Sequence, residues 1–445
     1  LLITKLGNPG YSLIDYACGK AGDLPKWINA NLAFILGIDL SKDNIENRMD
    51  GACARYLNYL KKYNTLPKAL FLNGNSFMNI KDGTAFSSEK NKLIIQALFG
   101  EGVKNELTLG KNVYNNYGIA QNGFNISSIQ FAMHYMFEKE SILTEFLKNV
   151  AQCTQLEGYF IGTCYDGIKV FNLLSSIDID NSITLFKNDK KIWEITKKYN
   201  FDKYEDNESC IGYAIDIYKE SINKTFREYL VNFNYLIRIL ENYGFTLLSQ
   251  EEIKTLDLPN SIGNFNELFN VMESDLEKNV HLSNKIGAAL SMSKEEKQIS
   301  FLNKYFIFKK VRNVSLDDVS NIAKYNETSQ DEFIDEFNEI NKSIDDLEKD
   351  NIEANKQLLM KSLKKQPSQD VSKEKSETSV SNTEKKTKPK KTTSKKTTIV
   401  KETGKKASEI KEEPTPKSTS KKTNIDKKKS VDKTPGDNLE YKKNY

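Results

Sequence analysis

Residues 12–39 place a turn of small side chains between two apolar runs that each end in a carboxylate. The first run ends at Asp15 and the second at Asp39. Between them, the turn 17–22 has so little side-chain bulk that its backbone N–H groups can approach a ligand closely. In an open α/β sheet, ligands lie beyond the carboxyl ends of the strands, where Asp39 could hold a ribose diol. The stretch therefore predicts a nucleoside-binding crevice.

The turn also limits which nucleoside cofactor can bind. It lacks the G-x-G-x-x-G spacing of dinucleotide-binding loops, so a pyrophosphate-containing cofactor is a poor match. A nucleoside cofactor without a pyrophosphate fits better, and S-adenosyl-L-methionine is the common one. The chain has two histidines, His134 and His281, and no spacing typical of a metal site. We therefore expect this cofactor and no metal.

Three motifs, in the same order, resemble those of messenger RNA cap (guanine-N7) methyltransferases. DYACGKAGD at 15–23, followed by GIDLSKDNI at 37–45, is similar to the cofactor motif of that family. QFAMHYMFE at 130–138 and REYLVNF at 227–233 resemble its two later motifs. The sequence that begins at Gly37 is most similar to that of capping enzymes of large DNA viruses. The resemblance extends over residues 1–311 and implies a doubly wound, mostly parallel α/β fold of the Rossmann-like class I methyltransferases.

The resemblance implies which residues bind the cofactor. Backbone groups of Ala17 and Gly19 are expected around the methionine moiety, Asp39 on the ribose, and Asp15 at the methionine ammonium, directly or through water. Asn75 stands where the family tends to have an acid near the adenine. A solvated surface lysine remains the alternative for Lys20, and a helix-capping surface acid for Asp39. The predicted cofactor-binding residues are Asp15, Ala17, Gly19, Lys20, Asp23, Asp39, Asn75 and Gln130.

The resemblance also implies a pocket for the guanine of the cap. Aromatic rings such as Phe131 and Tyr135 can stack on a base, and His134 could donate to guanine O6. Glu228 could accept from guanine N1–H and N2–H₂, a pattern that adenine does not offer. Tyr305 lies two residues after the position of a family tyrosine. The alternatives are a core aromatic cluster, a satisfied core histidine and an exposed acid.

The expected reaction needs no catalytic acid or base. Guanine N7 carries an exposed lone pair, so transfer of a methyl group from a sulfonium is an in-line displacement. The enzyme has to align N7, the methyl carbon and the sulfur, and proximity supplies much of the rate. We therefore name no catalytic residue.

Apolar runs predict the strands of the sheet. We expect parallel strands at 12–15, 34–38, 69–72, 124–129 and 158–163. Segments 213–217, 228–233 and 245–248 are expected to complete the same sheet, with a last strand within 301–311. Residues 178–208 are expected to form strands that cover the site.

Capping residues and apolar spacing predict the helices near the crevice. Asp23 is expected to cap the helix that carries Trp27, and Ser41 to cap one long helix that runs to Leu60. Glu140 is expected to begin a helix that reaches Val150.

The composition changes sharply along the chain. Residues 1–311 form the predicted methyltransferase domain, 312–364 show the spacing of an amphipathic helix, and 365–445 form a lysine-rich tail without Phe or Trp. Such a tail cannot bury enough apolar surface to fold, so we predict disorder. Its lysines could hold RNA phosphates weakly, or could serve solubility or nuclear targeting.

The remaining expectations concern partners and location. Five scattered cysteines indicate a reducing, intracellular compartment. No stretch has the length of a membrane span. We expect capped RNA as partner, in a host cytoplasm, virus factory, virion or nucleus. The resemblance to viral capping enzymes implies triphosphatase and guanylyltransferase domains or subunits as further partners. The two alternatives are a methyltransferase for another base or small molecule, and a non-catalytic RNA-binding capping subunit.

Overall fold

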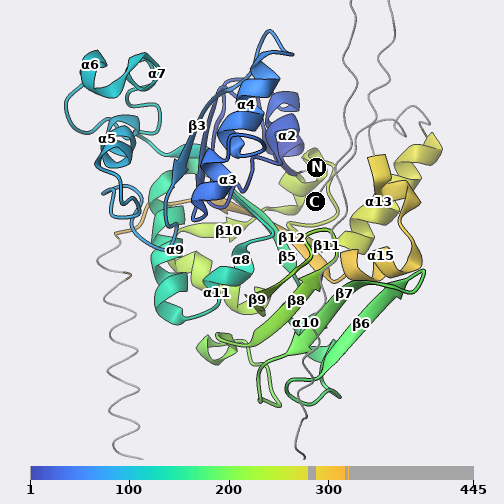
Figure 1. Cartoon of the computed structure of the whole chain (residues 1–445). Helices are drawn as coiled ribbons and strands as arrows, with labels where there is room; N and C mark the ends of the chain where they lie inside the picture. The colour runs from blue at the N-terminus through green and yellow to red at the C-terminus, as the bar shows by residue number, and fades with distance from the viewer. Residues whose placement is uncertain (1, 279–286, 316–318, 320–445) are drawn as a thin grey trace, which may run out of the picture. The chain divides into compact units, whose positions relative to one another are not determined.

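A mostly parallel sheet forms the centre of the protein (Figure 1). The computed structural model describes residues 2–278, 287–315 and 319, all of which belong to one compact unit. The strand order is β10-β12-β5-β4-β1-β2-β3, and β11 pairs with β12. The strands are β1 (Ser12–Asp15), β2 (Phe34–Asp39), β3 (Lys68–Asn73), β4 (Phe124–Gln130), β5 (Thr154–Tyr165), β10 (Phe245–Leu247), β11 (Ile262–Asn264) and β12 (Asn303–Lys310).

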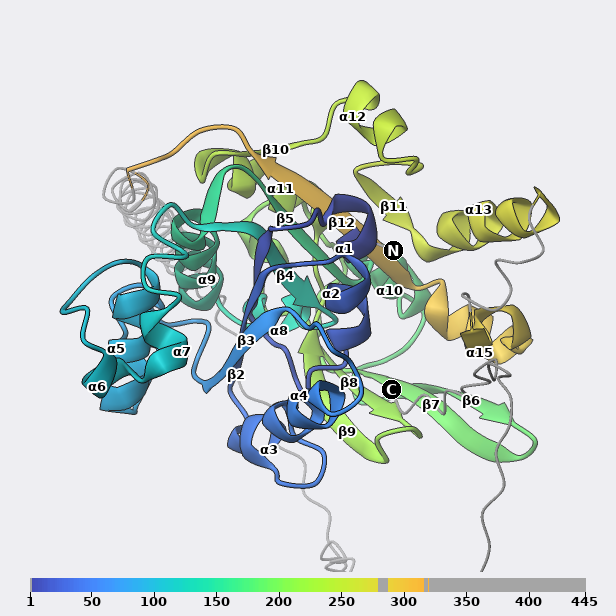
Figure 2. The ribbon, with the colours of Figure 1, turned by 90° about the horizontal axis from the view of Figure 1, so that it is seen from above.

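Helices cover both faces of this sheet (Figure 2). Successive strand residues point to opposite faces, so Leu13 packs in one apolar cluster and Ile14 in the other. One layer holds α1 (Leu2–Leu6), α2 (Leu24–Asn29), α4 (Ala52–Leu60), α12 (Gln250–Thr255) and α13 (Phe265–Lys278). The other holds α5 (Glu89–Leu98), α6 (Glu106–Leu109), α7 (Lys111–Tyr114), α9 (Glu140–Cys153) and α11 (Phe233–Asn242).

The direction of the chain across the sheet reverses at β1. β2 pairs with one edge of β1 and β4 with the other, both in parallel register. The chain passes outward through β2 and β3 and then returns to β4 and β5, which makes the sheet doubly wound. This confirms the predicted fold class. In such folds the point of reversal, here at the carboxyl ends of β1 and β4, is the usual place of the ligand crevice.

A second, antiparallel sheet lies between β5 and α11 in the sequence. Its order is β6-β7-β8-β9, and α10 (Gly167–Leu173) precedes it. The prediction of strands within 178–208 is confirmed, whereas 213–217 and 228–233 do not join the central sheet as predicted. Only one face of β7 and β8 is buried, and such strands form an antiparallel layer of their own. The strands are β6 (Ser182–Lys187), β7 (Lys190–Lys197), β8 (Ala214–Lys219) and β9 (Lys224–Tyr229).

The long helix predicted from Ser41 to Leu60 is wrong. Ser41 does cap a helix, since its side chain accepts from the N–H of Asn44, but that helix, α3 (Lys42–Glu46), is short. The Asn47 side chain accepts from the backbone N–H of Met49 and Asp50, at 2.9 and 3.4 Å, and this local turn competes with helix geometry. The chain resumes as α4 after Gly51.

The two C-terminal predictions cannot be compared with the structure. The predicted helix over 312–364 lies outside the described residues except for 312–315 and 319, and the tail over 365–445 lies wholly outside them. Short helices elsewhere are α8 (Met133–Met136), η1 (Glu208–Cys210), η3 (Gly287–Ser291) and α15 (Lys294–Ser300). In the described part of the chain, no helix is long and apolar enough to cross a membrane.

Asn149 on α9 holds the loop that follows β3. Its amide donates to the carbonyls of Ser76 and Met78 and accepts from the N–H of Ile80, all at 2.9 Å or less. Asn149→Ala would leave these buried backbone groups unpaired, so we expect the free energy of unfolding to fall by about 3 kcal/mol in urea titrations. Lys148→Ala, which removes only a surface ion pair with Glu145, is the control and should cost at most about 0.5 kcal/mol. Equal stability of the two variants would contradict this role.

Candidate active site

The small-residue turn is hydrogen-bonded to the acid at the end of β2. The Gly19 N–H donates to Asp39 Oδ2 at 2.8 Å. Asp39 Oδ1 accepts from the Ser41 N–H at 2.9 Å and from Asn44 Nδ2 at 3.0 Å. Gly19 has a φ of +53°, and a Cβ placed there would meet no heavy atom within 4 Å. The backbone of the turn therefore borders open space beside a fixed carboxylate.

Asp15 supplies a second acid at the same edge of the sheet. It ends β1 and accepts from the Ala17 N–H at 3.2 Å. Burial raises the pKa of Asp15 well above its usual 3.8, and the charges of Asp23 and Asp39 add to this effect. A cationic ligand group at this point would relieve the cost of ionising Asp15, because an opposite charge favours the carboxylate. The crevice thus suits a ligand that carries an ammonium group.

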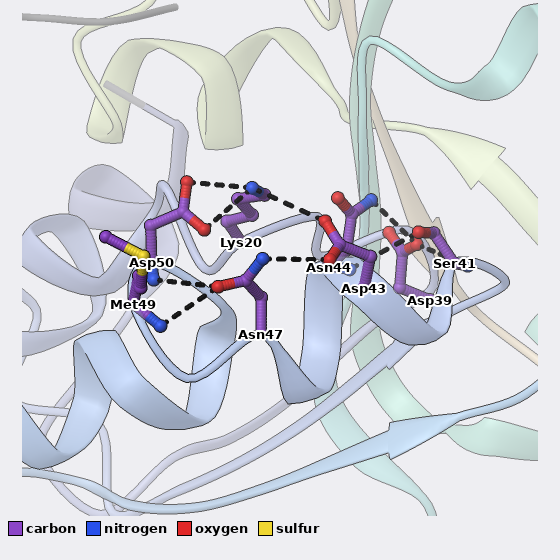
Figure 3. Close-up of polar contacts among 8 residues, drawn as sticks. All are labelled: Lys20, Asp39, Ser41, Asp43, Asn44, Asn47, Met49 and Asp50. Atoms are coloured by element: carbon purple, nitrogen blue, oxygen red, sulfur yellow. Dashed lines mark hydrogen bonds and ion pairs between the residues drawn. The ribbon is translucent and has the colours of Figure 1, made fainter.

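The side chain of Lys20 is engaged elsewhere (Figure 3). Its Nζ lies 2.8 Å from both carboxylate oxygens of Asp50 and 3.6 Å from Asp43 Oδ2. These acids belong to the α3 region, where the Asn47 turn interrupts the helix and brings Asp50 into reach. Figure 3 shows Lys20 directed to Asp50 and Asp43, so the structure does not bring its ammonium to Asp39.

Asp23 departs from the predicted cap. It occupies the N-cap position of α2, but its φ of −87° and ψ of 0° are helical and its side chain makes no capping bond. The carboxylate instead pairs with Lys26 Nζ one turn later. The extended backbone that a capping side chain needs is absent here, because the turn already runs into the helix with helical geometry.

Two predicted amide side chains lie near the carboxyl ends of parallel strands. Asn75, beyond β3, accepts from the N–H of Phe77 at 3.0 Å. Gln130, at the end of β4, accepts from Thr163 Oγ1 and donates to Ser128 Oγ, both at 3.1 Å. The structure therefore fixes Gln130 beside β5 and Asn75 in the turn after β3.

A buried histidine on a helix faces a buried glutamate on the antiparallel sheet. His134 lies on α8, Glu228 lies on β9, and they are 4% and 3% exposed. His134 Nδ1 is 3.7 Å from Glu228 Oε2, which is too long for a hydrogen bond. Among the described residues, neither ring nitrogen of His134 nor Glu228 Oε2 has a hydrogen-bond partner. Each such atom costs about 1–3 kcal/mol, so a ligand that supplies partners would bind here.

The charge state of this pair suits a polar ring. Burial lowers the pKa of His134 below its usual 6.5, although the Glu228 carboxylate opposes the shift. At neutral pH the imidazole is therefore uncharged and presents one donor and one acceptor. Glu228 Oε1 lies 3.4 Å from Lys219 Nζ, which leaves Oε2 open toward His134. A donor and acceptors side by side match the edge of a nucleobase.

Two predicted aromatic residues, Phe131 and Tyr135, follow the end of β4, and the centroid of the Phe131 ring lies 6.2 Å from that of Phe265 on α13. The centroid of the Tyr135 ring lies 4.2 Å from that of the His134 ring, and the two rings meet edge to face. Burial raises the pKa of Tyr135 to about 12, and the charges of both Glu228 and Asp39 contribute, so Tyr135 lies within electrostatic reach of both acids. Phe131 has a φ of +55°, an uncommon geometry for a bulky residue, and its ring is half-exposed. Strained aromatic residues at a crevice are typical of ligand-binding positions.

Comparison with known proteins identifies the family. The model of the mRNA (guanine-N(7))-methyltransferase domain matches residues 7–311. The chain belongs to this family. It is 25% identical over 343 residues to a probable mRNA-capping enzyme of Acanthamoeba polyphaga mimivirus, covering 72% of this chain and 27% of the viral protein.

Cellular members of the guanine-N7 methyltransferase family are also similar. The mRNA cap guanine-N(7) methyltransferase of Saccharomyces cerevisiae is 27% identical over 259 residues, covering 56% of this chain and 49% of the yeast protein. The chain thus spans less than half the length of both relatives. Family membership confirms the predicted resemblance, and S-adenosyl-L-methionine is the cofactor of such methyltransferases.

One predicted site residue, Tyr305, does not lie with the others. Tyr305 is fully buried, and its hydroxyl donates to the Asn260 carbonyl at 2.9 Å. It packs with Ile161 and Ile307 in the cluster on the α1–α2 face of the central sheet, so the structure does not bring it to His134. In the described residues, no group of histidine, cysteine or acidic side chains could hold a metal ion.

The structure places two further residues, which the sequence motifs did not indicate, close to Glu228 in the candidate site. Tyr165 ends β5, and Lys219 ends β8 with its ammonium 5.4 Å from the Tyr165 ring centroid. Lys219 follows Ile215 and Ile217 at a spacing of two, which places it on the same face of the strand. This alternation indicates in the sequence that Lys219 lies on the buried face. Only the pairing of β8 with β9, however, connects Lys219 with Glu228.

Gly19→Ala tests the turn. The left-handed φ would cost about 1–2 kcal/mol, and the new methyl group would enter the open space beside Asp39. We expect the affinity for S-adenosyl-L-methionine, measured by calorimetry, to fall at least about tenfold. Gly22→Ala is the matched control, since a Cβ there also meets no atom within 4 Å and no positive φ is required. Equal affinities for the two variants would show that the turn does not border the cofactor.

Proposed function

We propose that residues 7–311 transfer a methyl group from S-adenosyl-L-methionine to N7 of the terminal guanine of an RNA 5′ cap. The observation that carries this proposal is the buried His134–Glu228 pair, whose unpartnered atoms face each other beside the crevice. Membership of the guanine-N7 methyltransferase family supports it. In this proposal, the cofactor binds at the carboxyl ends of β1 and β2, and the guanine binds beside the His134–Glu228 pair.

Three residues fit the cofactor. The Asp15 carboxylate, whose pKa is raised by burial, would be stabilised by the methionine ammonium. Gly19 leaves room for a close backbone approach, and Asp39 is fixed at the end of β2, where a ribose diol can donate to it. When bound, this cofactor supplies an electrophilic methyl group on a sulfonium. Of the other predicted contacts, Asn75 and Gln130 remain proposals, and Lys20 would contribute its backbone rather than its paired ammonium.

The buried pair would read the guanine. Glu228 accepts from N1–H and N2–H₂, while the neutral His134 donates to O6 from one ring nitrogen. Among the described residues, both ring nitrogens of His134 and the Oε2 atom of Glu228 lack hydrogen-bond partners, so binding would satisfy these atoms while Glu228 Oε1 keeps its contact with Lys219. Tyr135, and Phe131 at the rim, would pack on the faces of the base.

The residues would act by alignment. N7 has its own lone pair, so no side chain has to remove a proton before methyl transfer. The base is held by His134 and Glu228, the donor by Asp15 and Asp39, and Tyr135 is within electrostatic reach of both sets. Orienting the reacting atoms can account for about 7–11 kcal/mol of a barrier. The Glu228 charge would also favour the positive charge that develops on the ring.

The two alternatives are less well supported. A methyltransferase for another base would have no use for a carboxylate that faces a histidine donor, because adenine presents no N1–H and N2–H₂ pair. A non-catalytic subunit would have no need of a Gly19–Asp39 bond that shapes a cofactor crevice. The viral relative, a probable mRNA-capping enzyme, supports partnership with triphosphatase and guanylyltransferase domains. Capped RNA is the proposed substrate, in a reducing cytoplasm, virus factory, virion or nucleus.

Glu228→Gln tests the guanine assignment. The amide keeps the size of the carboxylate but offers one acceptor instead of two and no charge, so two charge-assisted hydrogen bonds are lost or weakened. We expect methyl transfer to guanosine-capped RNA to fall by about 100-fold or more, with affinity for S-adenosyl-L-methionine within about twofold of the parent protein.

The control for this test is Glu220→Gln. Glu220 lies on the β8–β9 hairpin and pairs with Lys190 at the surface, so the same chemical change there should leave transfer within about twofold. If Glu228→Gln retains full activity while folded, Glu228 does not read the base and the guanine assignment is wrong.

A further inference from the structure

Lys219 brings a positive charge into the guanine half of the site. It is the last residue of β8 and pairs with Trp193 of β7 and Lys224 of β9. Its side chain is 31% exposed, and Nζ lies 3.4 Å from Glu228 Oε1. The carboxylate therefore has one oxygen beside an ammonium and the other open toward His134.

Tyr165 fixes the position of this ammonium. The Lys219 Nζ lies over the Tyr165 ring, 5.4 Å from its centroid, a geometry that attracts a cation. Tyr165 is itself buried, and its hydroxyl accepts from Trp193 Nε1 at 3.2 Å. The Lys219 charge also lowers the pKa of His134, after the larger effect of burial, which places the ammonium within electrostatic reach of His134.

The proposed reaction changes the charge of the base that this pocket holds. Guanine enters neutral and leaves as a cation after N7 methylation, whereas the pocket residues keep their charges. Glu228 alone would bind the cationic product more tightly than the substrate, because opposite charges attract strongly in a partly buried site. A nearby ammonium that offsets the carboxylate removes that advantage, since it repels the cation but hardly affects the neutral base.

We infer that Lys219 sets the preference of the pocket for unmethylated over methylated guanine, and so speeds release of the methylated cap; this rests on the proposed function. Lys219 is a specificity-determining residue here and takes no part in the displacement itself. Its ammonium offsets part of the negative charge of Glu228 and still leaves the carboxylate able to bind the base. A carboxylate oxygen can accept from Lys219 and from the base together.

The test compares two cap dinucleotides, GpppA and its N7-methylated form, as probes for the full chain. Lys219→Met removes the charge and keeps an unbranched side chain. We expect the ratio of the two dissociation constants to shift about tenfold toward the methylated cap, and product inhibition to appear at about tenfold lower concentration. Lys219→Arg should restore the parent ratio because it keeps the charge.

The matched control is Lys190→Met, which removes a surface lysine of the neighbouring strand that pairs with Glu220. Its ratio should equal that of the parent protein. A Lys219→Met protein that loses affinity for both caps equally would mean that Lys219 contacts the phosphate bridge or only supports the fold, and would overturn the inference. Failure of the parent protein to bind either cap would instead overturn the proposed function.

Discussion

The surrounding fold has to offset the free energy that is lost because His134 and Glu228 are buried without their full set of hydrogen-bond partners. Taking a carboxylate and an imidazole out of water is unfavourable unless their hydrogen bonds are replaced. Here they lie 3.7 Å apart, too far to bond to each other, and Lys219 engages only one oxygen of Glu228. The surrounding fold has to impose this arrangement. Sites that store such a cost are usually those at which a ligand recovers it.

Two layers share that task. The central sheet places Asp15 and Asp39 at the ends of adjacent parallel strands, which any doubly wound fold of this order would do. The inserted antiparallel sheet has a different role, since its buried face packs Trp193 and Ile195 with residues of α10 and brings Glu228 to His134 of α8. Figure 1 shows β8 and β9 running up to α8 beneath the central sheet. In the proposed site, the insertion would thus supply the acid that distinguishes the base, and the common core the acids that bind the cofactor.

The sequence predicted the central strands closely because they are short, apolar and bounded by polar turns. Strand β1 ends at Asp15 and β2 at Asp39, where the apolar runs stop. The predictions failed where local hydrogen bonds end a helix or where the pairing of strands determines which sheet they join. The Asn47 side chain interrupts a helix whose apolar spacing is otherwise regular. The sequence of β8 or of β9 by itself does not indicate that these two strands pair.

The same limits apply to the site. His134, Tyr135 and Glu228 could be predicted from their motifs, and the structure brings them together. Tyr305 was predicted from an alignment position, but its hydroxyl is held by Asn260 in the core. Tyr165 and Lys219 carry no motif, and their place near Glu228 follows only from the way the strands end.

The most direct measurement is methyl transfer from labelled S-adenosyl-L-methionine to three RNAs of one sequence, capped with guanosine, capped with adenosine, or uncapped. The cap nucleotides are then released and separated to locate the label. Label on the guanosine cap alone, at N7, is the predicted result. Label on the adenosine cap or within the uncapped chain, or none at all on RNA while the protein binds the cofactor, would contradict a site built to read guanine.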